Sequence, residues 1–371
     1  MDQSAPALSH KDRIAWLRLA RTPRVGAMTF RALLDRYGSP GRALDALPEL
    51  AKRGGRALTP LSRDAAEAEL QAIEAQGARL IAQCEPDYPA ALAAIDDAPP
   101  LLCVKGNPAL FGGRIIAMVG ARNASLNGKR IAERWARELG DAGWVVVSGL
   151  ARGIDGAAHR GALATGTIAC VAGGIDVIYP PEHAELQAAI AEQGVVATEC
   201  APGTAPTARH FPRRNRLIAG MAIGVVVVEA AARSGSLITA RLAGEQGREV
   251  FAVPGSPLDP RAQGCNRLIQ NGAALVQSVS DILDELQSFT VRSLREPGSR
   301  YNADEGLGDP DEADLQKARA LIEESLSPTP TPVDELIRDC QLPASVVLTV
   351  LLELELAGRI ERQPGNRISL L

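Results

Sequence analysis

Residues 144–155 read WVVVSGLARGID, an apolar run followed by a turn of small residues and the start of a helical pattern. The same succession recurs from about residue 100 to residue 290. Continuous apolar strands that alternate with helices are typical of a parallel sheet covered on both faces. The sequence therefore predicts a Rossmann-like, doubly wound α/β domain, with strands at 114–119, 144–148, 167–172, 195–199, 224–229 and 249–253 and helices at 127–140, 155–164, 182–193, 212–222 and 236–246.

The N-terminal region carries a helical pattern interrupted by proline and glycine. Residues 23–39, PRVGAMTFRALLDRYGS, resemble a helix-hairpin-helix unit, which elsewhere holds DNA phosphates through the N–H groups of its hairpin. Arg24 stands where one of the two usual hairpin glycines would be. We therefore favour a small helical packing domain, of the SAM or helix-hairpin-helix kind, over a DNA-binding one.

The C-terminal region predicts a winged helix: three helices at 315–326, 333–340 and 344–357, then a hairpin formed by 359–362 and 367–370. In winged helices that read DNA, the third helix enters the major groove and needs basic or amide side chains. Here that helix carries Glu353 and Glu355. Protein contact or stabilisation is therefore favoured over DNA reading. The expected boundaries are 1–80 for the helical domain, 81–288 for the sheet domain, 289–313 for a flexible linker and 314–371 for the winged helix.

The composition of the chain limits the classes of function that it can have. The chain has 371 residues, 46% of them hydrophobic, and a net charge of −4, which by itself does not indicate a polyanion partner. The six cysteines are scattered without a Cys-x-x-Cys pair, and the four histidines lack the spacing of metal ligands, so we expect neither metal nor other cofactor. No basic and apolar leader and no apolar run near the ~20 residues of a membrane span is present. We expect a cytoplasmic protein.

Three strand-to-helix turns are candidate anion sites. They are residues 120–125, 148–155 and 234–240, and each combines glycine with small residues after a predicted strand. Such turns present backbone N–H groups to phosphates, and ligands of these folds bind beyond the carboxyl ends of the strands. Residues 209–216, RHFPRRNR, add arginines and an aromatic ring in a region without acids between Glu199 and Glu229. Guanidinium groups bind phosphates and an aromatic face stacks an unpaired base, so this pattern favours single-stranded nucleic acid.

Several of these residues also have structural interpretations. Arg152 is expected to contact phosphate, with an ion pair to Asp155 as the alternative. Asp155 and His159 are four apart on one helix face, but a helix N-cap and a packed side chain explain them better than an acid–base pair. The sequence does not decide whether Asn215 contacts phosphate or stabilises its helix. Glu229 is expected to orient arginine or backbone N–H groups.

A series of motifs through the α/β domain closely resembles the DNA processing protein A family, also called Smf. The motifs are VGARNAS (119–125), SGLARGIDGAAH (148–159), GIDVIYP (174–180), FPRRNRLIAG (211–220), VEA (228–230), RSGSLITA (233–240), GREVFAVPG (247–255) and GCN (264–266). The resemblance implies a dimeric protein without catalytic activity that binds single-stranded DNA and helps load the RecA recombinase on incoming strands during natural transformation. One departure is Ala208, where the family often has a basic residue; Arg209 can substitute.

The candidate DNA- or phosphate-binding residues combine the resemblance with the residue patterns. They are Gly120, Arg122, Ser125, Ser148, Gly149, Arg152, Gly153, Arg209, Phe211, Arg213, Arg214, Asn215, Arg216, Ser234, Gly235 and Ser236. The alternative is a nucleotide-binding enzyme of the phosphoribohydrolase type that uses the same crevice. The chain lacks the Pro-Gly-Gly turn that such an enzyme requires, and no acid follows Ser236 until Glu245. A dinucleotide-dependent oxidoreductase is disfavoured because the first turn has one glycine instead of Gly-x-Gly-x-x-Gly.

Overall fold

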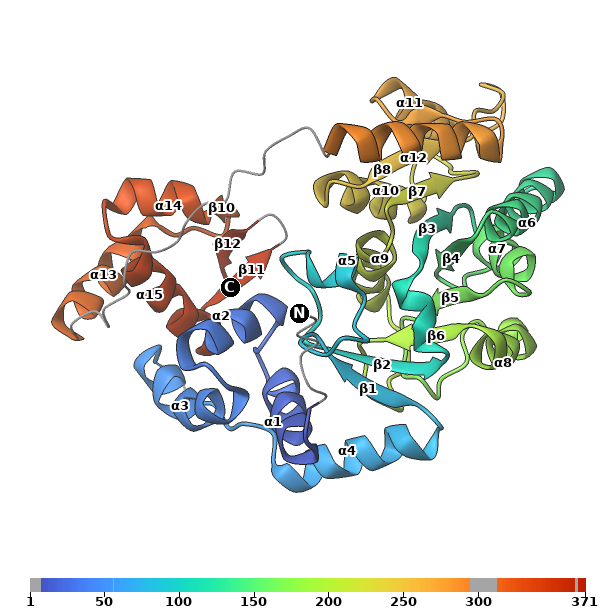
Figure 1. The fold of residues 1–371 in the computed structure, drawn as a ribbon. Helices are drawn as coiled ribbons and strands as arrows, with labels where there is room; N and C mark the ends of the chain where they lie inside the picture. The colour runs from blue at the N-terminus through green and yellow to red at the C-terminus, as the bar shows by residue number, and fades with distance from the viewer. Residues whose placement is uncertain (1–7, 56, 294–311, 364–365) are drawn as a thin grey trace. The chain divides into compact units, whose positions relative to one another are not determined.

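The computed structural model describes residues 8–55, 57–293, 312–363 and 366–371. The chain forms two compact units (Figure 1). One is the sheet domain, which begins after residue 67 and continues to the end of the second described segment. The other joins residues 8–67 to the C-terminal region that follows residue 297. The predicted linker at 289–313 overlaps the last helix of the sheet domain and otherwise lies almost wholly outside the described residues; the predicted boundaries stay a prediction.

The sheet domain is built on nine strands among the described residues, in the order β1-β2-β6-β5-β4-β3-β7-β8-β9. From β6 to β9 all neighbours are parallel, as the sequence predicted, whereas β1 and β2 are antiparallel additions at one edge. The strands are β1 Arg79–Ala82, β2 Leu101–Gly106, β3 Arg114–Val119, β4 Trp144–Ser148, β5 Thr167–Cys170, β6 Val195–Thr198, β7 Gly224–Val227, β8 Glu249–Ala252 and β9 Ala274–Leu275.

Helices cover both faces of this sheet (Figure 1). Alternate residues of β3 show why: Ile116 and Met118 pack into one buried cluster, and Ile115 and Ala117 into the other. The first cluster is closed by α6 Leu126–Asp141, α7 Ile154–Ala162 and α12 Val279–Ser293. The second is closed by α5 Ala90–Ala93, α9 His210–Met221, α10 Ser236–Glu245 and α11 Gln263–Gln270. A short 3-10 turn, η1 Pro108–Gly112, precedes β3, and η2 Pro181–His183 leads into α8 Ala184–Gln193. The predicted doubly wound domain is confirmed.

The strand order reverses at β3. Successive strands β4, β5 and β6 extend the sheet on one side of β3, and β7, β8 and β9 extend it on the other. Loops that leave neighbouring strands in opposite directions open a crevice at the carboxyl ends of the strands. The loops after β3, β4 and β7 therefore meet where a doubly wound fold places its ligand.

The second unit contains two helical modules. The N-terminal module consists of α1 His10–Arg21, α2 Ala27–Tyr37, α3 Pro40–Arg53 and the start of α4 Arg63–Ala75. The C-terminal module has α13 Glu312–Ser325, α14 Val333–Cys340 and α15 Ala344–Leu356, with a small sheet ordered β10-β12-β11. The strands of this sheet are β10 Thr331–Pro332, β11 Ile360–Gln363 and β12 Arg367–Leu370. Three helices followed by a hairpin confirm the predicted winged helix, and β10 is an unpredicted third strand.

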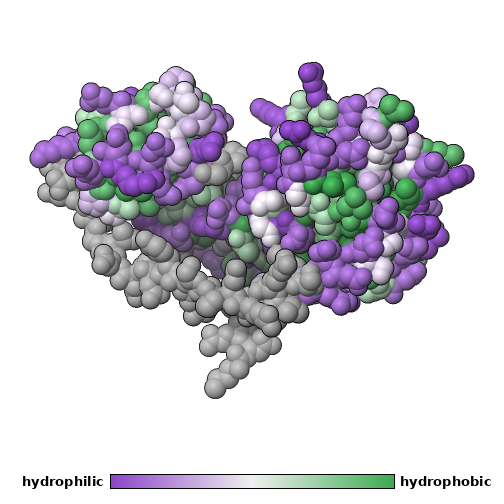
Figure 2. Space-filling model, turned by 90° about the horizontal axis from the view of Figure 1, so that it is seen from above, coloured by the Kyte–Doolittle hydropathy of each residue, from purple (hydrophilic) through white to green (hydrophobic). Residues whose placement is uncertain are grey.

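Hydrophilic residues cover most of the face of the molecule that Figure 2 shows. Figure 2 shows one face of the molecule, on which hydrophobic residues gather in a small patch at the right. Among the large apolar side chains that the structure describes, Leu258 is the most exposed, at 91%. No helix in the described ranges combines the length and the apolar character that a membrane crossing requires.

Candidate nucleic-acid interface

A pocket opens beside the strand-order reversal, at the carboxyl ends of β3, β4 and β5, and has a volume of about 230 Å³. Its walls come from the loops after β3, β4 and β5 and from the first turn of α9. Four predicted residues that line it are Arg122, Gly149, Arg152 and Phe211, and a fifth, Arg214, forms its back wall. The other lining residues are Asn123, Leu150, Ala151, Ala172, Tyr179 and Pro180.

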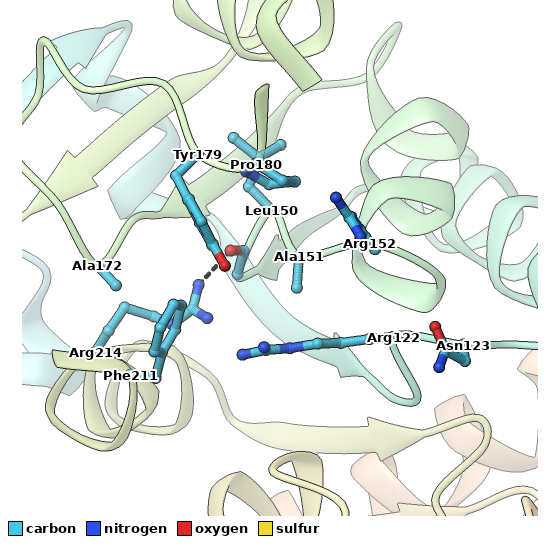
Figure 3. A pocket seen from close by; sticks show the side chains of 11 residues that line it. Arg122, Asn123, Leu150, Ala151, Arg152, Ala172, Tyr179, Pro180, Phe211 and Arg214 are labelled. Carbon is cyan, nitrogen blue, oxygen red and sulfur yellow. Dashed lines mark hydrogen bonds between the residues drawn. The ribbon is translucent and has the colours of Figure 1, made fainter. Parts of the chain in front are cut away.

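Two aromatic rings lie next to each other in the pocket. Phe211 comes from α9 and Tyr179 from the loop after β5; their ring centroids are 5.7 Å apart and their planes meet at 53°. Arg122 extends across the pocket toward Phe211 (Figure 3), and its Cζ lies 4.8 Å from the ring centroid. A guanidinium at this distance is attracted to the ring face by a cation–π interaction. The pocket thus offers stacking surfaces beside a positive charge.

The floor of the pocket is held by two histidines. Leu150 is fully buried and has φ of +55°, a left-handed conformation that is costly for a branched side chain. Its N–H donates to Nε2 of His159 at 3.3 Å, and its carbonyl accepts from Nδ1 of His183 at 3.0 Å. Both backbone groups of the strained residue are therefore fixed by imidazole rings.

The first of these rings belongs to a relay that sets its tautomer. Because Nε2 of His159 accepts a hydrogen bond, the proton of the neutral ring is on Nδ1, which donates to the Thr167 hydroxyl at 2.9 Å. That hydroxyl in turn donates to the Val146 carbonyl at 2.6 Å. Burial lowers the pKa of His159 to about 3, and the charges of His183 and Arg214 act in the same direction. The ring is therefore neutral at physiological pH.

Asp155 does not form an acid–base pair with His159. Its carboxylate accepts from the N–H of Ala151 at 3.3 Å, and so stabilises the turn that forms the pocket floor. The N-cap of α7 is Gly153, so the expectation that Asp155 is the N-cap is wrong by two residues. Burial raises the pKa of Asp155, an effect that the nearby charge of Arg214 opposes.

The arginines of the 209–216 run lie in different environments. Arg214 is 6% exposed; its Nη1 donates to the carbonyls of Gly149 and of Cys170, the latter at 2.7 Å. Arg216 is also buried, and it forms ion pairs with Glu199 and Asp97, neither of which lines the pocket. Two others, Arg209 and Arg213, are exposed, and Arg213 lies 3.6 Å from Glu199. Asn215 is buried, accepts from Nε of Arg214 and donates to the Gly235 carbonyl at 3.4 Å.

Arg152 lies at the rim of the pocket, on the side away from Phe211 (Figure 3). It is 61% exposed and pairs with Glu182, in place of the pair with Asp155 that was considered from the sequence. An exposed pair of this kind is weak, because water competes with it. The Arg152 guanidinium can therefore exchange Glu182 for a phosphate at small cost.

The first strand–helix turn is occupied by a carboxylate of the protein itself. Ser125 is the N-cap of α6, and both its N–H and its hydroxyl donate to the Glu229 carboxylate. A Cβ on Gly128 would lie 2.5 Å from Cδ of Glu229, so the carboxylate sits against the first turn of the helix. A helix N-terminus favours negative charge there. The expectation that Glu229 orients backbone N–H groups is confirmed at Ser125.

The remaining predicted residues shape the backbone around the pocket. Ser148 is buried and donates to the Met118 carbonyl at 2.6 Å. A Cβ on Gly120 would lie 2.6 Å from Cγ1 of Ile154, and Gly153 has φ of +77°, so both positions need glycine. In the third turn, the hydroxyls of Ser234 and Ser236 are 2.7 Å apart, Gly235 is exposed, and none of the three lines the pocket. Their contact with DNA stays a prediction.

Sequence reasoning missed Tyr179 as a site residue. It belongs to GIDVIYP, a motif that was noted without a role, and it follows β5. The rule that ligands bind beyond the carboxyl ends of strands could have found it, since β5 is next to β4 in the sheet. Asn123, Ala151 and Ala172 follow strands in the same way.

Comparison with known proteins agrees with this architecture. The sequence model of DNA recombination-mediator protein A matches residues 79–287, more than half of the chain. The chain belongs to the DNA recombination-mediator protein A family. The models of the DprA-like N-terminal HHH domain and of the DprA winged helix domain match residues 10–72 and 308–366. The family resemblance found in the sequence is confirmed.

Relatives of the family match most of the chain. Protein Smf of Escherichia coli K12 is 40% identical over 311 residues, which make up 83% of this chain and 82% of that protein. DNA processing protein DprA of Bacillus subtilis is 45% identical over 226 residues, 60% of this chain and 76% of that protein. The X-ray structure of DNA processing protein A from Streptococcus pneumoniae has a TM-score of 0.63 at 34% identity, and the match covers 76% of this chain and 99% of that one.

A second solved member of the family is DNA processing protein A from Helicobacter pylori, whose structure concerns its single-stranded DNA binding mode. It has a TM-score of 0.53 at 28% identity, and the match covers 57% of this chain and 96% of that one.

Proposed function

We propose that the protein binds single-stranded DNA at the pocket between the loops after β3, β4 and β5. The observation that carries this proposal is the placement of Phe211 and Tyr179 inside a pocket whose charged side chains are all arginines. An unpaired base can stack on an aromatic ring, while its phosphates contact guanidinium groups; a duplex hides its bases from such rings. The Helicobacter pylori relative, a single-stranded DNA binder, supports the proposal.

Within this proposal, the predicted residues have two kinds of role. Arg122, Arg152 and Phe211 contact DNA directly, and the exposed Arg209 and Arg213 extend the positive surface beyond the pocket. The buried residues of the candidate set position these groups. Arg214 and Asn215 fix the Gly149 and Gly235 backbones, and the buried Arg216 joins α9 to Glu199.

The pocket can hold only part of a DNA single strand. Its volume of about 230 Å³ is below the ~300–1,000 Å³ typical of small-molecule sites. Glu229, the acid nearest the first strand–helix turn, is held by Ser125. His159 and Asp155 are committed to backbone and Thr167. These features support binding without turnover over a phosphoribohydrolase reaction.

The biological role that we propose follows from the family. The chain would bind incoming single strands in the cytoplasm during natural transformation, protect them and help load the RecA recombinase, acting as a homodimer. The relatives named DNA processing protein DprA support this role. The exposed Leu275 on the edge strand β9 is compatible with a protein–protein interface on the sheet domain. Stimulation of RecA filament formation on single strands would test loading, and sedimentation would test the dimer.

Fluorescence anisotropy of labelled oligothymidine across a salt series tests the binding proposal. If Arg122, Arg152, Arg209 and Arg213 each neutralise one phosphate, the slope of log K against log salt is about −3. Loss of Phe211 to alanine should remove about 1–3 kcal/mol per stacked base. Arg152→Ala should weaken binding and flatten the salt dependence.

The matched control is Arg241→Ala. Arg241 is 63% exposed and pairs with Glu245, much as Arg152 is 61% exposed and pairs with Glu182, but Arg241 does not line the pocket. We expect it to bind like the unchanged protein. Equal losses in the Arg152 and Arg241 variants would mean that net charge, not the pocket, binds the strand. Full competition by duplex would remove the stacking role of Phe211.

A further inference from the structure

The hairpin between α1 and α2 has an arginine in a glycine-like conformation. Arg24 has φ of +67°, and the hairpin is closed by the hydrogen bond from the Val25 N–H to the Thr22 carbonyl at 3.1 Å. A non-glycine residue in this region of backbone space is uncommon and costs conformational energy. In helix-hairpin-helix proteins this hairpin presents N–H groups to DNA. The side chain that replaces glycine must therefore have another partner.

That partner is the last turn of α15, in the winged-helix module. Nη1 of Arg24 donates to the Leu356 carbonyl at 2.9 Å. The same side chain lies against Gly358, where an added Cβ would be 2.9 Å from Nε of Arg24. Carbonyls in the last turn of a helix lack intrahelical partners and carry partial negative charge, so a guanidinium is well suited to them.

Further contacts join α15 to the N-terminal module before the last turn of the helix. Nη1 of Arg36 donates to the hydroxyl of Thr349 at 3.3 Å, two turns before the Arg24 contact. At Gly54 the two backbones touch: an added Cβ would lie 2.1 Å from the Glu353 carbonyl oxygen and 2.8 Å from Cβ of Ala357. A contact this close requires glycine at the end of α3.

The two acidic side chains of α15 form ion pairs inside the second unit. Glu353 is fully buried and pairs with Arg319 of α13. Glu355 is largely buried and pairs with Arg362 of β11, and burial raises its pKa. The helix with which a winged helix enters the major groove thus presents no positive charge to a duplex.

We propose that the N-terminal helical module is the receptor for helix α15 of this chain. In this closed pair, each module covers the element through which relatives of the other module reach DNA. Hairpin 22–26 binds the end of α15, and α2 and α3 cover α15. Neither module then contacts DNA. The proposal concerns the second unit alone and does not depend on the pocket of the sheet domain.

Substitution of Gly54 by valine tests the proposal. The backbone of Gly54 is right-handed helical (φ −70°), so a side chain is strained there only by the approach of α15. The matched control is Gly41→Val in the same helix, where an added Cβ has no neighbour within 4 Å. Hydrogen exchange should accelerate about tenfold or more in hairpin 22–26 and in residues 349–357 of the Gly54 variant only, because overpacking opens the contact. Strands β3 to β7 should keep their protection.

Unchanged exchange in both variants would overturn the proposal, since a docked helix cannot accommodate the valine. If Gly54→Val fails to fold, Arg24→Ala replaces it, with the same regions expected to exchange faster. The Arg24 variant also tests the hairpin against DNA. Its affinity for oligothymidine and for a duplex of equal length should match that of the unchanged protein, and a severalfold loss for either would mean that the hairpin contacts DNA.

Discussion

Replacement of His159 by glutamine tests the relay that holds the pocket floor. The Leu150 N–H donates to Nε2 of His159, and only a neutral ring can accept it. Burial, together with the charges of His183, Arg214 and Arg160, lowers the pKa of His159 to about 3. Glutamine has an oxygen that can accept from Leu150 and an amide N–H that can donate to Thr167, but it does not titrate.

The lowered pKa of His159 determines how the free energy of unfolding changes with pH. An unfolded histidine titrates near pH 6.5, so between pH 6.5 and pH 3 the unfolded chain binds a proton that the folded chain does not. The stability contributed by the neutral ring is therefore complete above about pH 6.5 and is lost as the pH falls. From the two pKa values, the free energy of unfolding should decrease by about 2 kcal/mol between pH 7 and pH 5 through this group alone.

Urea unfolding at pH 5, 6 and 7 measures this loss. Trp135 and Trp144 belong to the sheet domain, whereas Trp16 belongs to the other unit, so a Trp16→Phe background restricts the fluorescence signal to the domain of interest. The decrease in stability toward pH 5 should be about 2 kcal/mol smaller in His159→Gln than in its parent. His10→Gln, at an exposed position, is the control. Equal pH dependence in all three proteins would refute the relay.

Three further substitutions probe the surroundings of the pocket by urea unfolding. Gly149→Ala places a Cβ 2.1 Å from Nη1 of Arg214 and should cost about 1–3 kcal/mol through overpacking, together with weaker DNA binding. Arg216→Met removes the buried guanidinium that pairs with the largely buried Glu199 carboxylate and should cost about 3 kcal/mol, while the salt dependence of DNA binding stays unchanged. Glu229→Gln removes a negative charge from the N-terminus of α6 and should cost about 1 kcal/mol, more at low salt than at high salt.

Local pattern predicted most of the fold. Val145, Val146 and Val147 form a continuous β-branched run, and glycine-rich turns end such runs, so the parallel strands and their order along the chain were evident. Strands β1 and β2 were missed. They are antiparallel and lie outside the strand–helix alternation. β1 pairs with β2, and β2 pairs with β6, which follows more than 80 residues later in the chain. No local pattern encodes such a distant pairing.

The site was predictable as a region but not residue by residue. Arg213 and Arg214 are neighbours in one run, yet the side chain of the first is 66% exposed and the second is buried. Helical geometry turns them to different sides. The buried Arg214 donates to the carbonyls of Gly149, in the loop after β4, and of Cys170, at the end of β5. The contribution of Tyr179 likewise depends on the fold, which brings its loop to Phe211.

The Glu229 carboxylate at the start of α6 affects how well small phosphate compounds in a cell can compete for this turn. Free nucleotides and inorganic phosphate are natural ligands for a helix N-terminus at this point of a doubly wound fold. Here they would have to displace Glu229, a group covalently tethered at a high effective concentration. Small phosphate compounds therefore compete poorly at this turn, and the neighbouring arginines remain available to a polymer that engages several of them at once.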